Sequence, residues 1–216
     1  MNSKTGCAAA LILLCLFSAP GEARAQARED VPKVEVGVQF SSLTLSDNFN
    51  TTQPGFGGRV TYNLTESVAV EAETNFFPNE LSFRTDHSGG RASQAHFGVK
   101  AGRRFDKFGL FAKARPGLVH FTKTQRVSGF STDTFNGETF IFPNFRTQSV
   151  THFATDIGGV IEFYPSRRLV TRFDAGDTII RHGGYDAPRF FSGELEHRPS
   201  AVTHNFQFTA GIGFRF

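Results

Sequence analysis

The last thirteen residues of the chain, His204 to Phe216, alternate strictly between apolar positions and polar or glycine positions. This two-residue period predicts a β-strand with one apolar face, because successive side chains of a strand point to opposite sides. The apolar face is almost entirely aromatic and consists of Phe206, Phe208, Ala210, Ile212, Phe214 and Phe216. Such a strand either buries its Phe face in a protein core or presents that face to lipid, and the rest of the chain decides between the two.

Seven further segments repeat this alternation. Together with the last one they predict eight strands, at residues 33–45, 54–64, 68–77, 93–105, 110–121, 150–163, 169–180 and 204–216. Short turns at 63–67, 106–109 and 164–168 alternate with longer polar loops at 46–53, 78–92, 122–149 and 181–201. We therefore predict an all-β fold, an eight-stranded antiparallel transmembrane β-barrel with an up-and-down meander, short periplasmic turns and longer extracellular loops. Lipid offers no partner for an unpaired strand edge, so the last strand should pair with the first.

The apolar positions of the first predicted strand change parity. They are even in residues 34–40, whereas Leu43 and Leu45 are odd. Two explanations remain open, a β-bulge at Ser41-Ser42 or a strand that leaves the membrane at this point.

The first 25 residues predict a secretory signal peptide, so residues 26–216 would be the barrel domain. Lys4 supplies the positive start, residues 8–17 form a short apolar core, and Ala23-Arg24-Ala25 matches a cleavage site. That core is too short to span a membrane as an anchor.

Both cysteines, Cys7 and Cys15, fall within this leader, which excludes disulfides and zinc-thiolate sites from the mature chain. Without its leader the chain is close to charge balance, which gives no reason to expect nucleic-acid binding. A hydrophobic content of 39% excludes a helical membrane protein. The 26 Phe and 22 Gly instead favour many close-packed strands.

The leader, the turn rhythm and the terminal aromatic pattern resemble the small outer-membrane β-barrel proteins of Gram-negative bacteria, including the OmpA-type and OmpX-type barrels of the porin-like superfamily. The resemblance implies export to the cell outer membrane, contact with outer-membrane lipid and lipopolysaccharide, and a monomer without a cofactor. It also implies an assembly signal read by the barrel assembly machinery, formed by Phe206, Phe208, Ile212, Phe214 and Phe216. Two departures are the lack of a downstream peptidoglycan-binding domain, so that no cell-wall tether is implied, and an aromatic girdle without Trp.

The polar faces of the predicted strands would enclose eleven charged residues. They are Arg59, Glu71, Glu73, Lys100, Arg104, Lys113, Arg115, Asp156, Glu162, Arg172 and Asp174. An eight-stranded barrel is only just wide enough for side chains, and unpaired buried charges cost several kcal/mol each, so we expect a paired network that plugs the lumen. The alternative is a charged conduction path.

Catalytic and metal sites have weaker support. Candidates for a hydrolase of the lipid A deacylase type are His96, His120, Thr122, His152 and the run Asp86-His87-Ser88, but no pair has that family's spacing. Possible cation ligands are Asp133, Glu138, His182, Asp186 and His197, for which solvated loop charges are the simpler account. We expect no catalytic residue, metal site or cofactor.

The longest predicted loop, 122–149, contains Phe130, Phe135, Phe140, Phe142 and Phe145. We expect the flanking strands to continue outside the membrane as a hairpin with Asn136-Gly137 at its tip, the Phe rings packing on each other. An adhesive apolar surface for an extracellular ligand is compatible with this. The sequence thus predicts a barrel with a structural or cell-surface interaction role. The alternatives are a narrow porin for small solutes and a soluble periplasmic lipocalin-like ligand-binding barrel.

Overall fold

The computed structural model describes residues 32–46, 50–81, 84–85, 87–189 and 193–216, so the predicted signal peptide lies outside the described residues. Within these ranges, no helix is long and apolar enough to cross a membrane. The described strands are β1 (Val34–Leu45), β2 (Thr51–Asn63), β3 (Val68–Leu81), β4 (Gly90–Arg104), β5 (Phe108–Phe135), β6 (Glu138–Ser166), β7 (Leu169–His182), β8 (Tyr185–Arg189), β9 (Glu194–Arg198) and β10 (Ala201–Arg215).

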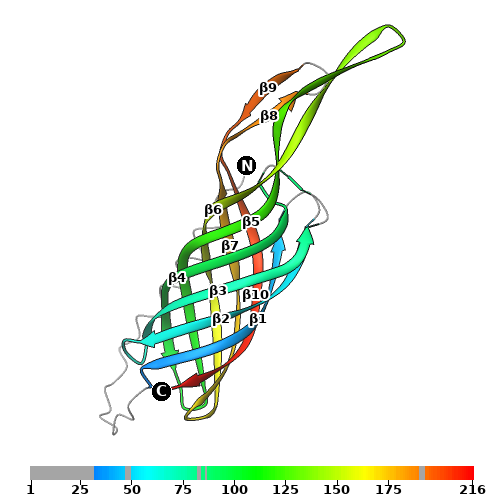
Figure 1. The fold of residues 1–216 in the computed structure, drawn as a ribbon. Coiled ribbons are helices and arrows are strands. Elements are labelled where there is room, and N and C mark those ends of the chain that lie inside the picture. Colours follow the sequence, from blue (N-terminus) through cyan, green and yellow to red (C-terminus); the bar gives the residue numbers. More distant parts are fainter. Residues whose placement is uncertain (1–31, 47–49, 82–83, 86, 190–192) are drawn as a thin grey trace. The chain divides into compact units, whose positions relative to one another are not determined.

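Eight of these strands form a closed antiparallel barrel in the order β1-β10-β7-β6-β5-β4-β3-β2 (Figure 1). Closure comes from the pairing of β10 with β1, in which Val36 lies opposite Phe214 and Phe40 opposite Ala210. The predicted architecture and the predicted seam are therefore confirmed.

Side chains alternate across the barrel wall as the sequence predicts. Val38, Phe97 and Phe214 point outward and are 67%, 62% and 59% exposed, whereas Glu71 and Arg115 point inward and are buried. A soluble lipocalin-like barrel would have the opposite arrangement, with apolar side chains around an internal cavity and charges outside. That alternative is wrong for this chain.

The first strand contains no bulge. Its register with β10 is continuous from Glu35 to Thr44, and its register with β2 from Val34 to Leu45. Leu43 and Leu45 point inward and are buried because they belong to an apolar layer inside the barrel mouth, together with residues such as Phe77 and Phe121. Of the two explanations for the parity change, the strand leaving the membrane fits and the bulge does not.

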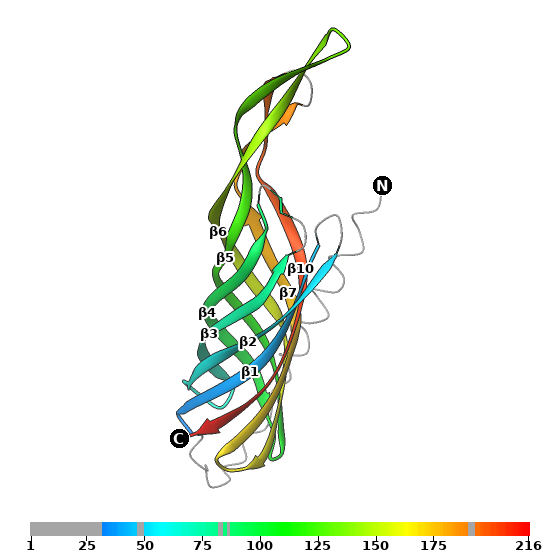
Figure 2. The same ribbon diagram turned by 45° about the vertical axis from the view of Figure 1, so that its right-hand side comes forward.

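The strands β5 and β6, with 28 and 29 residues, continue past the barrel as a two-stranded ribbon (Figures 1 and 2). Pairing runs to Phe135 opposite Glu138, and Asn136 and Gly137 form the turn with φ angles of 52° and 82°. Positive φ at both positions is the geometry of a tight hairpin turn, so the predicted hairpin and its tip are confirmed.

The predicted packing of the ribbon's Phe rings on each other is found between Phe140 and Phe142, whose ring centroids lie 6.5 Å apart, but it does not enclose the rings. Phe135, Phe142 and Phe145 are 70%, 40% and 45% exposed. A two-stranded ribbon has no second layer to cover its faces, so side chains spread along it remain open to water.

The segment 181–201 is not the simple polar loop that its composition suggests. It contains β8 and β9, which pair as a separate two-stranded sheet from Tyr185 opposite Arg198 to Arg189 opposite Glu194. All residues of β9 are exposed, and β8 has no buried residue. Neither strand therefore shows the hydrophobic alternation that identifies a half-buried strand.

Candidate functional site

The barrel interior is built around two arginines from β7 and β5, the two strands that flank β6. Arg172 on β7 is 1% exposed, and its two terminal nitrogens bond to both carboxylate oxygens of Glu71 on β3, with Nη2 donating to Oε2 at 2.9 Å. Its Nε donates to Oδ1 of Asp174 at 2.6 Å. This fork geometry provides hydrogen-bond acceptors for a planar guanidinium group that is buried away from water.

The second arginine, Arg115 on β5, is fully buried and hydrogen-bonds to three carboxylates. Its Nη1 donates to Glu73 at 2.6 Å and to Glu71 at 3.3 Å, and its Nε donates to Asp156 at 3.0 Å. Glu71 therefore joins the two arginines into one network.

Two buried lysines extend this network along the barrel. The Nζ of Lys113 lies 2.9 Å from Asp156 and 3.5 Å from Asp174. The Nζ of Lys100 pairs with Glu162 and lies 3.5 Å from Glu71. Every carboxylate in this part of the lumen has at least one cationic partner, as burial of charge requires.

The short-turn end of the lumen contains three residues that were not among the predicted eleven, namely Glu35, Tyr164 and Arg215. Arg104 lies 3.4 Å from Glu35, and Arg215 lies 3.4 Å from the same carboxylate. The hydroxyl of Tyr164 donates to Glu162 at 2.9 Å. Glu35 and Arg215 occupy inward positions of the alternation, so the strand period alone would have identified them.

Ten of the eleven predicted lumen residues are linked by these ion pairs, and Arg59 is the exception. It is 4% exposed and its Nη1 donates to Gln39 at 3.3 Å. Among the described residues, no carboxylate oxygen lies within ion-pair distance of Arg59. A glutamine dipole thus replaces the partner that the sequence reasoning expected.

Toward the long-loop end the interior changes from charged to apolar, and a histidine cluster adjoins the apolar layer, with His152 opposite Val119. The His182 ring centroid lies 4.4 Å from that of His87 and 4.6 Å from that of His152. His152 Nε2 donates to the backbone carbonyl of His87 at 2.9 Å. These contacts join the β3–β4 loop to β6 and β7 across the barrel mouth.

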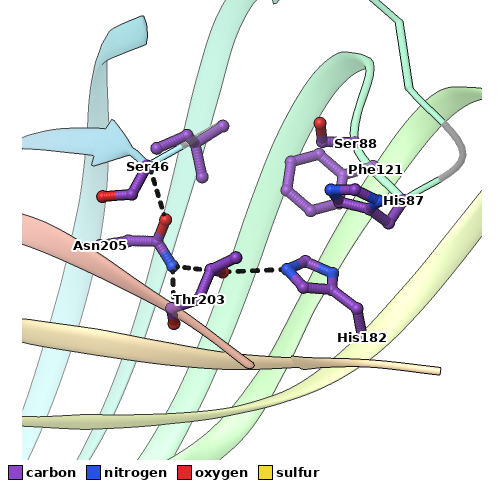
Figure 3. A pocket seen from close by; sticks show the side chains of 8 residues that line it. Ser46, His87, Ser88, Phe121, His182, Thr203 and Asn205 are labelled. Carbon is purple, nitrogen blue, oxygen red and sulfur yellow. Dashed lines mark hydrogen bonds between the residues drawn. The ribbon is translucent and has the colours of Figure 1, made fainter. Parts of the chain in front are cut away.

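A small cavity lies beside this cluster, with room for about one water molecule. In Figure 3, His182 is linked through Thr203 to Asn205 and Ser46. The cavity lining also includes Phe121. Because the cavity is this small, it leaves little open space at this place in the mouth.

Comparison with known proteins identifies the architecture. A sequence model of the family described as "Outer membrane protein beta-barrel domain" matches residues 9–216. The chain belongs to this family. No curated protein matches the sequence.

Several solved structures have a similar fold. The outer membrane protein OprG of Pseudomonas aeruginosa is 11% identical over 87% of this chain and 97% of its own, with a TM-score of 0.50. The N-terminal barrel domain of Pseudomonas aeruginosa OprF is 13% identical over 84% of this chain and 97% of its own, with a TM-score of 0.43. Ail of Yersinia pestis is 13% identical over 85% of this chain and 97% of its own, also with a TM-score of 0.43.

As an outer-membrane barrel, the chain has its long-loop end outside the cell and its short turns in the periplasm. The outward side chains of β10 are apolar from Phe216 to Phe206, and the next outward residue, His204, pairs with Asp177 on β7. This polar pair marks the outer edge of the lipid-facing belt. The predicted assembly residues Phe206, Phe208, Ile212, Phe214 and Phe216 lie within the belt and face lipid.

The histidine cluster lies beyond that edge. Burial lowers the pKa of His152, and burial followed by the charges of His87 and His152 lowers the pKa of His182 to about 3. Both rings are therefore neutral at pH 7 and fit the apolar mouth.

Of the candidate catalytic residues, His87 and His152 meet in the histidine cluster, whereas the others lie apart. His96 is buried in the lumen, whereas His120 on the outer wall hydrogen-bonds to Thr151. Ser88 hydrogen-bonds to Thr85 in the β3–β4 loop, and Asp86 lies outside the described residues. Thr122 receives a hydrogen bond from the backbone of Arg91, so its hydroxyl is part of the strand pairing.

The candidate cation ligands are also dispersed. Asp133 and Glu138 lie near the ribbon tip, His182 lies in the mouth, and Asp186 pairs with His197 at 2.9 Å across β8 and β9. No group of three potential ligands in the described part of the chain could hold a metal ion.

Proposed function

We propose that this outer-membrane barrel is non-enzymatic, does not conduct through its lumen, and has a structural or cell-surface interaction role. The observation that carries the proposal is the filled interior, in which the charged network and the apolar layer succeed each other along the barrel. The charged side chains of the network are at most 10% exposed, so little water lies between them.

A conduction path would need mobile or unpaired charges facing water. The lumen instead contains seven cations (Arg59, Lys100, Arg104, Lys113, Arg115, Arg172 and Arg215) and six carboxylates (Glu35, Glu71, Glu73, Asp156, Glu162 and Asp174), all but Arg59 joined in ion pairs. Separating such a pair in a low-dielectric interior costs several kcal/mol, which opposes ion passage. The apolar layer at the mouth adds a second barrier.

Planar-bilayer recording of the purified, refolded protein tests this proposal. We expect no steady ohmic conductance, with an open trimeric porin in the same bilayer as the positive control. Steady conductance proportional to voltage would make the narrow porin the correct function. A gel that compares a heated aliquot with an unheated one confirms, by the difference in mobility, that the protein added to the bilayer was folded.

The ribbon of β5 and β6 supports the surface role. It extends past the mouth, with β8 and β9 beside it in Figure 1. The ring of Tyr185 on β8 lies 5.6 Å from the guanidinium of Arg126 on β5. Its exposed Phe side chains, among them Phe142 in ring contact with Phe140, offer apolar area to a partner outside the cell.

A ribbon deletion tests the surface role without disturbing the barrel. Gln125 and Thr147 lie directly opposite each other, so an Asn-Gly turn can replace residues 126–146 and join the two strands. We expect intact cells carrying this variant to partition less into hexadecane droplets than cells with the full chain. The matched control replaces only Thr132 and Thr134 with Ser. Equal partitioning of all three would contradict an exposed apolar ribbon.

We also propose that the barrel is a monomer inserted by the barrel assembly machinery after signal-peptide-directed export. The closed seam supports the first point, because neither β1 nor β10 keeps a free edge. Phe216 is 73% exposed at the end of the chain and supports the second. Replacing Phe216 with Ser should lower the yield of heat-shifting protein in outer membranes, and an undiminished yield would remove the signal role.

A further inference from the structure

Three cations gather on one sector of the outer wall, just beyond the lipid-facing belt. Arg84, Arg91 and Lys123, here called the outer-rim cation cluster, belong to the β3–β4 loop, β4 and β5. A single carboxylate, Glu80, accompanies them, with Lys123 Nζ at 2.6 Å and Arg84 Nη2 at 3.9 Å from its oxygens. The cluster therefore has a net charge of about +2 while its side chains remain accessible, at 38% for Arg84 and 41% for Lys123.

The backbone holds the cluster together. Gly90 has a φ of 70°, and a Cβ there would lie 2.7 Å from the Cβ of Lys123, so only glycine permits this approach. The amide of Lys123 donates to the carbonyl of Gly89 at 3.1 Å, and the Nε of Arg91 donates to the carbonyl of Pro78 at 3.1 Å. The two strands thus present their cations at a fixed spacing.

The depth of the cluster is that of lipid headgroups. On the same wall, Phe76, Phe97 and Leu118 face outward and form the upper part of the lipid-facing belt. Along β3, Glu80 lies four residues beyond Phe76, two positions farther from the membrane on the exposed side.

Among the described residues of the other sectors, β7 carries one exposed cation at this level, Arg181. Arg126 and Arg146 lie opposite each other on β5 and β6, farther along the ribbon. Elsewhere around the wall the pairs are Thr44 with Thr52, His120 with Thr151, and His204 with Asp177. The cluster is therefore a local feature of β3, β4 and β5.

We propose that the outer-rim cation cluster binds the phosphate group of an anionic lipid in the outer leaflet. Two guanidinium groups can contact phosphate oxygens in a fork geometry, and the lysine adds a point charge. Glu80 pairs with Arg84 and Lys123 and therefore competes with the phosphate for these two cations. The inference rests on the membrane location of the barrel and is independent of whether the lumen conducts.

Native mass spectrometry of the full, refolded chain tests the proposal. The probes are bisphosphorylated lipid A and the same lipid without its phosphates. The variant R84Q/R91Q/K123Q should bind bisphosphorylated lipid A on the order of tenfold to a hundredfold more weakly than the unaltered chain, because each cation near an anionic surface contributes appreciably. E80Q should bind it several-fold more tightly, since the competing carboxylate is gone.

The matched control is R103Q/K107Q/R168Q, which removes three exposed cations from the periplasmic end. Its affinity should equal that of the unaltered chain, and the gel shift on heating establishes that all variants are folded. Equal binding by R84Q/R91Q/K123Q, or an equal loss in the control, would overturn the proposal. So would equal affinity for phosphate-free lipid, or displacement of the lipid by an equimolar amount of inorganic phosphate.

Discussion

The membrane-embedded part of the barrel and its outer mouth are made from the same strands but have opposite polarity. In β1, Gln39 points inward and Phe40 outward, whereas two pleats farther on Leu43 points inward and Thr44 outward. The wall is apolar outside and charged inside where lipid surrounds it. It is polar outside and apolar inside where water surrounds it.

This reversal shows that the strand period determines only the side of the wall, while the medium determines which side is apolar. In the lower region the interior is held by ion pairs that compensate one another's desolvation. In the mouth the interior is held by apolar burial, as in a water-soluble protein. The two regions should therefore respond differently to substitution.

The largest expected effect is in the charged region. Arg172→Met leaves Glu71 and Asp174 buried without this partner and should lower the free energy of unfolding by about 3–5 kcal/mol. Guanidinium unfolding followed by circular dichroism in lipid vesicles measures the change. Arg103→Met, at an exposed position, is the control, and a loss below about 1 kcal/mol at Arg172 would mean that the network is not required for stability.

Phe121→Ala tests the apolar mouth. The side chain is fully buried, so we expect a loss of about 3 kcal/mol from removed contacts and a residual cavity. Urea unfolding of this variant at low and high ionic strength checks this account, because urea is uncharged and apolar burial is not screened by ions. A loss that changes with ionic strength would contradict the apolar account.

Acid should loosen the mouth. The pKa of His182 is lowered to about 3 in the folded state, below the usual 6.5, so the unfolded state binds more protons as pH falls. Stability at this site is thus complete above pH 6.5 and decreases between pH 6.5 and 3. Since water reaches the adjoining cavity, we expect about 1 kcal/mol at pH 5.

Hydrogen exchange of the backbone amides from 87 to 89 measures this loosening. His182→Gln should remove most of the pH dependence, whereas His197→Gln, in the exposed β8–β9 sheet, should leave it unchanged. The quantity to compare is the protection factor, the intrinsic exchange rate divided by the observed rate. Protection factors that do not change with pH in the unaltered chain would show that the histidines do not hold the mouth closed.

The smallest effect is expected on the ribbon. Phe135→Ser changes a side chain that is 70% exposed at the tip, so the free energy of unfolding should change by less than about 0.5 kcal/mol. A larger loss would mean that the tip packs against another part of the protein.

The sequence predicts the barrel well because the alternation of apolar and polar side chains can be recognised within each strand separately. The seam, the eight barrel strands and the hairpin tip at Asn136-Gly137 follow from it. The structure also links Glu71, Arg115 and Arg172 across three walls, although the pairing partners depend on register, which one sequence does not specify.

Other features depend on contacts that no period encodes. Leu43 and Leu45 looked out of phase because the sequence does not say where along the barrel axis the membrane ends. Beyond that point an apolar side chain points inward instead of outward. β8 and β9 expose both faces and so show no hydrophobic pattern. Arg59 was expected to pair with a carboxylate, but it donates a hydrogen bond to Gln39 on β1, although Glu73 lies opposite it in the register of β2 and β3.

The reversal of polarity also determines how the barrel fits its bilayer. From Phe206 to Phe216, β10 rises roughly 33 Å along its own axis. A strand tilt of about 40° reduces that to an apolar height of about 25 Å. The charges below and the polar wall above prevent vertical sliding, so a thicker bilayer has to thin around the barrel at a cost of fractions of a kcal/mol per ångström. Hydrophobic matching therefore favours a thin membrane for this chain.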